Sequence, residues 1–226
     1  PHPTDIHGER LEDDYYWLRQ KDNPAVLAYL QAENSFAEEW LAPTRALQES
    51  LYAEMLGRIK QTDLSVPCRD GVHWYYTRTE EGKQYSIHCR KRGSLAAPEE
   101  ILLDLNRLAE GHPFMGLGVF QVSDDGRLLA YSTDPTGFRA YTLMVKDLDT
   151  GAVVAGPIEK CGAVAWAADN RTLFHTTEDA AKRFHRLWRL EVGGAGQLVY
   201  QEDDERFRVS VERTRSRRHL LVHLDS

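Results

Sequence analysis

The feature that most constrains the fold of this chain is a segment that recurs after 44 residues. Residues 119–131 (VFQVSDDGRLLAY) align with residues 163–175 (AVAWAADNRTLFH). Asp125 falls on Asp169 in this alignment, at the same turn between two apolar stretches. A repeat of this length, filled with short strands and turns, is typical of the blades of a β-propeller. We therefore predict a mainly β fold for most of the chain.

The repeat divides residues 63–226 into blades. The expected order is blade 1 at about 66–113, blade 2 at about 114–157, blade 3 at about 158–205 and a partial blade 4 at about 206–226. Blade 1 carries an insertion, because the Asp-Gly turns at 70–71 and 125–126 are 55 residues apart. Blades bury their faces only against neighbouring blades, so about three and a half of them leave apolar faces and strand edges open. We therefore expect the chain to be part of a larger protein.

Residues 1–62 have a different pattern, which predicts an N-terminal α-helical hairpin. Asn23 is a good N-cap and Pro24 suits the first helical position. Pro43 ends this helix, and Thr44 is expected to cap a second one. The apolar positions recur at helical spacing, with Asn34 in the first row: Leu27, Leu30, Ala37 and Leu41, then Leu47, Leu51, Met55, Leu56 and Ile59. Two such helices cannot bury both stripes alone, so they need a further surface.

Composition limits the function classes. The net charge of −7 argues against nucleic acid as the main partner, and no apolar stretch reaches the ~20 residues that cross a bilayer. Three widely spaced cysteines give no disulfide framework, so we expect a cytoplasmic location, with the periplasm as the alternative. Four arginines flank one hairpin turn, where we expect a solvated loop: Arg213, Arg215, Arg217 and Arg218.

Several sequence words resemble the prolyl oligopeptidase family of serine peptidases, and within it the oligopeptidase B branch. The words are HG at 7–8, DYYWLR at 14–19, QAENS at 31–35, LDLN at 103–106, DLDTG at 147–151, LVYQE at 198–202 and LLVHLDS at 220–226. The resemblance implies a seven-bladed propeller that caps a C-terminal α/β-hydrolase domain and limits substrates to short peptides. It also implies that residues 1–62 pack on that domain, and that the parent enzyme cleaves after Arg or Lys.

The resemblance places no catalytic residue in this chain. The nucleophile elbow Gly-x-Ser-x-Gly does not occur, so we expect the 226 residues alone to be inactive. Arg139 is the one candidate for the substrate cleft, because related members have arginine at this place; a solvated loop arginine is the alternative. No metal or organic cofactor is implied. His219 and His223 share a strand face, but no third or fourth ligand accompanies them.

A second hypothesis needs no chemistry at all. A partial propeller can act as a binding or scaffold module without enzymatic activity. Such a module does not require the DYYWLR motif at residues 14–19 or two helices with unpaired apolar stripes. These N-terminal features favour the peptidase interpretation.

Overall fold

A computed structural model describes residues 1–226 of the protein. The chain forms two compact units, residues 1–60 and residues 61–226, which we call the helical unit and the propeller unit. The boundary expected from the sequence lies two residues later. None of the helices combines the length and the apolar character that crossing a membrane requires.

The helical unit begins with a β-hairpin that the sequence does not predict. β1 (His2–Ile6) pairs antiparallel with β2 (Glu9–Asp13). The turn residues His7 and Gly8 both have positive φ, 51° and 84°, which is the backbone that a tight two-residue hairpin turn requires. The helical elements follow in the order η1 (Tyr16–Arg19), α1 (Pro24–Leu41), η2 (Ala42–Thr44) and α2 (Arg45–Arg58).

The expected helix start at α1 is confirmed, whereas the expected cap of α2 is wrong. Asn23 accepts the backbone N–H of Ala25 at 3.0 Å, and Pro24 is the first helical residue. Thr44 stands at the N-cap of α2, but its hydroxyl donates to the Leu41 carbonyl at 2.7 Å and accepts from the Gln48 side chain at 2.7 Å. The backbone of Thr44 is already helical, so its side chain caps no backbone N–H of α2.

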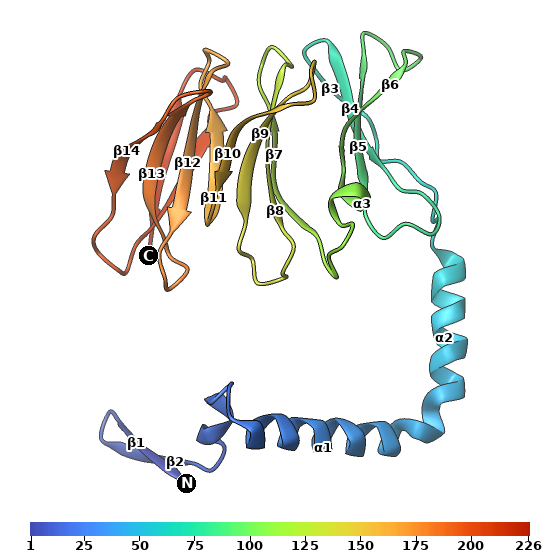
Figure 1. Ribbon diagram of the computed structural model, residues 1–226, viewed down its shortest axis with the longest axis vertical. Helices are drawn as coiled ribbons and strands as arrows, with labels where there is room; N and C mark the ends of the chain where they lie inside the picture. The colour runs from blue at the N-terminus through green and yellow to red at the C-terminus, as the bar shows by residue number, and fades with distance from the viewer. The chain divides into compact units, whose positions relative to one another are not determined.

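The two helices meet at η2 and do not run side by side (Figure 1). They therefore form a bent pair rather than the closed hairpin that the sequence suggests. Neither helix covers the apolar stripe of the other. Large apolar side chains remain exposed along both helices: Leu27, Leu30, Phe36, Trp40, Leu41, Leu47, Leu51, Tyr52, Met55 and Leu56.

The propeller unit consists of successive antiparallel meanders (Figure 1). Blade 1 contains β3 (Cys68–Asp70), β4 (His73–Arg78), β5 (Ile87–Arg92) and β6 (Glu99–Asp104). Blade 2 contains β7 (Gly116–Val122), β8 (Leu128–Asp134), β9 (Thr142–Asp147) and β10 (Val153–Ile158). Blade 3 contains β11 (Cys161–Trp166), β12 (Thr172–Glu178), β13 (Phe184–Glu191) and β14 (Gly196–Gln201). A two-stranded sheet, β15 (Arg208–Arg213) and β16 (Leu220–Asp225), ends the chain. The short helix α3 (Leu105–Leu108) follows β6.

The 44-residue repeat reappears in the backbone of blades 2 and 3. Their first strands, β7 and β11, each carry a register irregularity where they pair with the second strand. At both places a hydroxyl on the second strand accepts a backbone N–H that the ladder leaves free. Ser132 accepts from Val119, and Thr176 accepts from Ala163, each at 2.9 Å. The repeat found in the sequence is therefore one recurring structural unit.

Apolar cores lie between neighbouring blades. The core between blades 2 and 3 contains Ala130, Leu143, Val145, Cys161, Val164, Trp166 and Leu173. Trp166 also donates its indole N–H to the Gln121 carbonyl at 3.0 Å, which links the first strands of the two blades. The predicted fold class is confirmed: a mainly β partial propeller whose sheets do not close, preceded by helices.

Candidate functional site

The candidate residue Arg139 lies in the loop between β8 and β9. This loop is built around Asp134, the last residue of β8, which is 1% exposed. Its carboxylate accepts the N–H and the hydroxyl of Thr136 at 2.8 and 2.5 Å, and the backbone N–H of Arg139 at 2.7 Å. Burial acts to raise the pKa of Asp134, but these hydrogen bonds outweigh it and the pKa is lowered. The loop is therefore a fixed turn that positions Arg139 by its backbone.

The side chain of Arg139 is free, unlike its backbone. The residue is exposed and has φ of 57°, a left-handed conformation that the bond to Asp134 stabilises. The neighbouring Phe138 is also exposed. An unpaired guanidinium beside an aromatic ring can recognise a carboxylate or a peptide carbonyl. The expected role of Arg139 at a substrate cleft stays a prediction.

The corresponding loop of blade 3, between β12 and β13, is tied to this one. The Lys182 ammonium donates to the Phe138 carbonyl, which links the two loops directly. Asp179 organises the blade 3 loop as Asp134 does in blade 2, because it accepts the backbone N–H groups of Ala181 and Arg183 at 2.9 and 3.0 Å. The two loops form one ordered ledge at the same end of their blades.

Arg183 has a structural role that the sequence did not reveal. Its guanidinium pairs with Asp179 at 3.1 Å and donates to three carbonyls of the linker between β14 and β15: those of Glu202, Asp204 and Phe207, at 3.3, 3.0 and 3.1 Å. The acidic linker at residues 202–205 is thus hydrogen-bonded to the β12–β13 loop of blade 3. The four-residue spacing between Asp179 and Arg183 is the only signal of this in the sequence.

At the opposite end of the blades, two of the four arginines of the β15–β16 hairpin, Arg213 and Arg217, are paired, which corrects the expected solvated loop for these two. Arg213 forms a bidentate ion pair with Asp124, at 3.0 and 2.9 Å, and Arg217 binds the same carboxylate at 2.9 Å. Arg217 also pairs with Asp70 of the β3–β4 turn, and this bond raises the pKa of its guanidinium. The cluster joins blades 1, 2 and 4, whose residues are up to 147 positions apart.

Metal-ligating side chains are not gathered in the structure. No three His, Cys, Asp or Glu residues are grouped so that they could hold an ion. His219 lies before β16, and His223 within it stands 3.0 Å from Glu212. The exposed guanidinium of Arg139 gives the ledge a charged hydrogen-bond donor, which suits binding.

Comparison with known sequences shows where these blades belong. The family profile described as the prolyl oligopeptidase, N-terminal beta-propeller domain, matches residues 1–226. The chain belongs to the prolyl oligopeptidase family. It is 36% identical over 242 residues to the dipeptidyl aminopeptidase BI of Pseudoxanthomonas mexicana, covering 97% of this chain and 34% of that protein. It is 33% identical over 237 residues to protease 2 of Moraxella lacunata, covering 100% and 34%.

Solved structures of the prolyl oligopeptidase family have the same fold over this region. Oligopeptidase B from Leishmania major matches with a TM-score of 0.88 at 28% identity, covering 100% of this chain and 33% of that one. Oligopeptidase B from Trypanosoma brucei, with covalently bound antipain, matches with a TM-score of 0.87 at 32% identity and the same coverage. The chain thus spans about a third of the length of the relatives it matches.

Proposed function

We propose that the chain is the non-catalytic N-terminal and propeller portion of a serine-type oligopeptidase. The match of the family profile to residues 1–226 carries this proposal. The relatives named as peptidases are about three times as long, which leaves room for a C-terminal α/β-hydrolase domain. In this role the chain contributes docking and access, while acyl transfer takes place on the hydrolase domain.

The substrates proposed are short peptides cleaved after Arg or Lys, with the propeller restricting access. The likeness to two oligopeptidase B structures supports this class. A relative named dipeptidyl aminopeptidase and one named protease 2 are similarly close in sequence to this segment. Because proteins with these two different names are similar to this segment to a similar degree, we assign the cleavage preference to the hydrolase domain.

The exposed apolar face of the helical unit is the proposed docking surface for that domain. Trp40 is 75% exposed and stacks on Phe36 at a centroid distance of 6.2 Å, so a large aromatic patch faces outward. Leu51 and Met55 continue the exposed apolar character along α2. Exposed large apolar side chains gathered along two helices are typical of interaction surfaces. The helical spacing in the sequence predicts the leucine stripes but does not single out the pair of Phe36 and Trp40.

Activity tests separate this proposal from its rival. A fluorophosphonate probe is expected to leave the 226-residue chain unlabelled and to label one serine in the full-length protein. Fluorogenic dipeptides ending in Arg or Lys should be cleaved by the full-length protein far faster than those ending in Pro. Labelling of the short chain would overturn the proposal. Faster cleavage after Pro would overturn only the assigned preference.

Arg139 provides a test of the access role. In the full-length protein, Arg139→Ala should raise KM for peptides several-fold with little change in kcat, because a binding contact is lost without change to the chemistry. Arg127→Ala is the matched control, since Arg127 is an exposed arginine at the other end of β8. Equal effects of the two substitutions on KM would show that Arg139 makes no specific contact with the substrate.

The alternative is a stand-alone scaffold module. It is disfavoured by the exposed apolar helices, which a scaffold would have no reason to keep. Deleting residues 1–60 from the full-length protein distinguishes the two, because the peptidase proposal expects loss of activity and of soluble protein. For location we propose the cytoplasm: Cys68, Cys89 and Cys161 are all free thiols. Fractionation with antibody detection tests it.

A further inference from the structure

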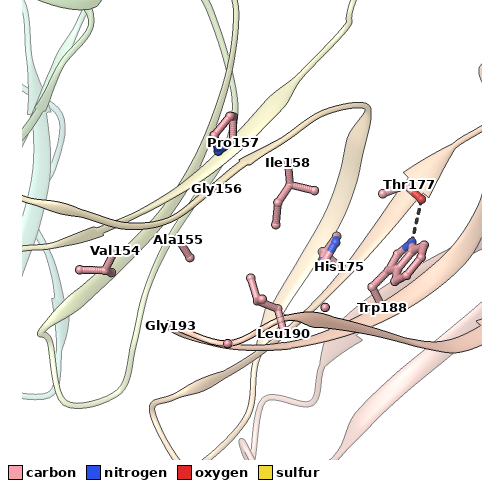
Figure 2. A pocket seen from close by; sticks show the side chains of 12 residues that line it. Val154, Ala155, Gly156, Pro157, Ile158, His175, Thr177, Trp188, Leu190 and Gly193 are labelled. Carbon is pink, nitrogen blue, oxygen red and sulfur yellow. Dashed lines mark hydrogen bonds between the residues drawn. The ribbon is translucent and has the colours of Figure 1, made fainter.

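A groove of about 600 Å³ lies between blades 2 and 3 and is not part of the ledge around Arg139 (Figure 2). One wall is β10, and the other is formed by β12, β13 and the turn before β14. The wall residues include Pro157, Ile158, Trp188 and Leu190, and no charged side chain lines the groove. Its size and apolar lining are those of a small-molecule site.

One polar side chain on the wall lacks a partner. His175 is 3% exposed and lies between Ile158 and Trp188, and its Nδ1 is buried without a hydrogen bond (Figure 2). Burial lowers the pKa of His175 to about 4, so the ring is neutral at pH 7. An unpaired buried polar atom carries an uncompensated desolvation cost. The Nδ1 atom has no exposed surface in the groove, so a ligand with a matching group would remove this cost once the imidazole turns toward the groove. By contrast, the Trp188 N–H is already satisfied by the Thr177 hydroxyl at 2.9 Å.

The equivalent space between blades 1 and 2 is filled by the protein itself. The 44-residue offset places Tyr131 where blade 3 has His175, and Met144 where it has Trp188. Tyr131 and Met144 pack in one apolar cluster with Leu105, from α3, and the nearby Met115. Leu105 and Met115 both lie in the connection between β6 and β7.

Blade 2 has no connection of comparable length, since only two residues separate β10 from β11. A further difference lies on the third strand. Lys146 of blade 2 donates to the Leu102 carbonyl of blade 1 at 3.1 Å, whereas the corresponding residue of blade 3 is Leu190, which lines the groove. The groove between blades 2 and 3 therefore lacks both the filling side chains and the bridging lysine of its counterpart.

We propose that this groove binds a small, uncharged aromatic molecule that carries one hydrogen-bonding group, with His175 as its polar partner. The apolar walls and the facing Trp188 ring suit an aromatic ligand. The absence of charged groups on the walls disfavours an ionised one. The bound molecule occupies the space that Leu105 and Met115 help to fill one blade earlier.

Indole is the probe for the test. In ¹H–¹⁵N spectra of the 226-residue chain, indole should shift the side-chain N–H of Trp188 in a saturable way, with the signal assigned by Trp188→Phe. Benzothiophene, which lacks the N–H, should bind about fivefold more weakly, the factor that one neutral hydrogen bond of about 1 kcal/mol provides. Indole-3-acetate, which is charged, should bind at least about tenfold more weakly than indole.

Two substitutions locate the site. Gly196→Leu should abolish binding by filling the groove; a Cβ at Gly196 meets nothing closer than 4.0 Å, so the variant should fold. Gln197→Leu, one residue further along β14 and outside the lining, is the control and should bind normally. His175→Phe keeps a ring and should weaken indole about fivefold while leaving benzothiophene unchanged.

The proposal is overturned if indole produces no saturable shift up to its solubility limit. It is equally overturned if Gly196→Leu binds indole as the unmodified chain does. No peptidase readout is used, so the result is independent of the proposed function.

Discussion

The helical unit and the propeller unit differ in how much apolar surface they bury. Val26 is the one large hydrophobic side chain buried in residues 1–60. In residues 61–226 each blade interface has its own buried core. Helices of this length are marginal without tertiary packing, so we expect α1 and α2 to need a surface outside their own unit. The blades supply most of their own packing to one another.

This difference predicts where mutations have an effect. A side chain in a blade core contributes to the stability of the isolated chain, whereas one on the helices contributes only when its partner is present. The first three of the following experiments test packing within the propeller unit, and the last tests the helical unit.

The largest effect is expected at Leu143, which is fully buried between blades 2 and 3. Leu143→Ala should lower the free energy of unfolding by about 2–5 kcal/mol, because it removes buried methyl groups and leaves a cavity. Urea unfolding followed by tryptophan fluorescence measures it, since Trp166 belongs to the same core. A loss below about 1 kcal/mol would mean that this core is not as tightly packed as described.

The next effect concerns pH. The pKa of His175 is about 4 in the folded chain against an ordinary 6.5, so between these values the unfolded state binds more protons. Stability should therefore fall as pH drops from 6.5 to 4, by about 3 kcal/mol in total. His175→Phe should remove this part of the pH dependence, as urea unfolding at pH 4.5, 5.5 and 6.5 will show. An unchanged pH profile in His175→Phe would contradict the burial of a neutral imidazole.

The sequence predicted the propeller well because its signals are local and repeated. The turn at Asp125 recurs at Asp169, and in both the carboxylate accepts the backbone N–H two residues on, at 3.0 Å. Such a bond depends only on neighbouring residues, so it can be deduced from spacing. The missed β1–β2 hairpin has strands without apolar alternation, all exposed, which leaves periodicity nothing to detect.

The sites were less accessible to sequence reasoning because they join distant parts of the chain. The pairing of Arg217 with Asp70 spans 147 residues, and the sequence showed only a run of arginines. Arg139 was named from the family resemblance, but the Asp134 turn that holds it emerged only from the structure. The groove at His175 is open because the short connection after blade 2 lacks the filling side chains found after blade 1. No residue motif in the sequence indicates such an absence.

A smaller effect is expected at Asp124 of blade 2, which binds two arginines of the β15–β16 hairpin. Asp124→Asn should lower the free energy of unfolding by about 1–3 kcal/mol, because Arg213 is largely buried and loses its charged partner. Asp149→Asn is the control: its pair with Arg127 is exposed on both sides and should contribute less than about 1 kcal/mol. If both variants lose the same stability, the cluster does not hold the blades together.

The smallest effect in the isolated chain is expected on α2, and it is the one that most sharpens the contrast between the units. Leu51 is 46% exposed, so Leu51→Ala should change the unfolding of the 226-residue chain by no more than about 0.5 kcal/mol. In the full-length protein the same substitution should cost about 2 kcal/mol or more, because there the leucine would be buried against the hydrolase domain. Thermal unfolding of both forms measures the pair of values. A small change in both would place the docking surface elsewhere, whereas a large change in both would show that α2 packs within its own unit.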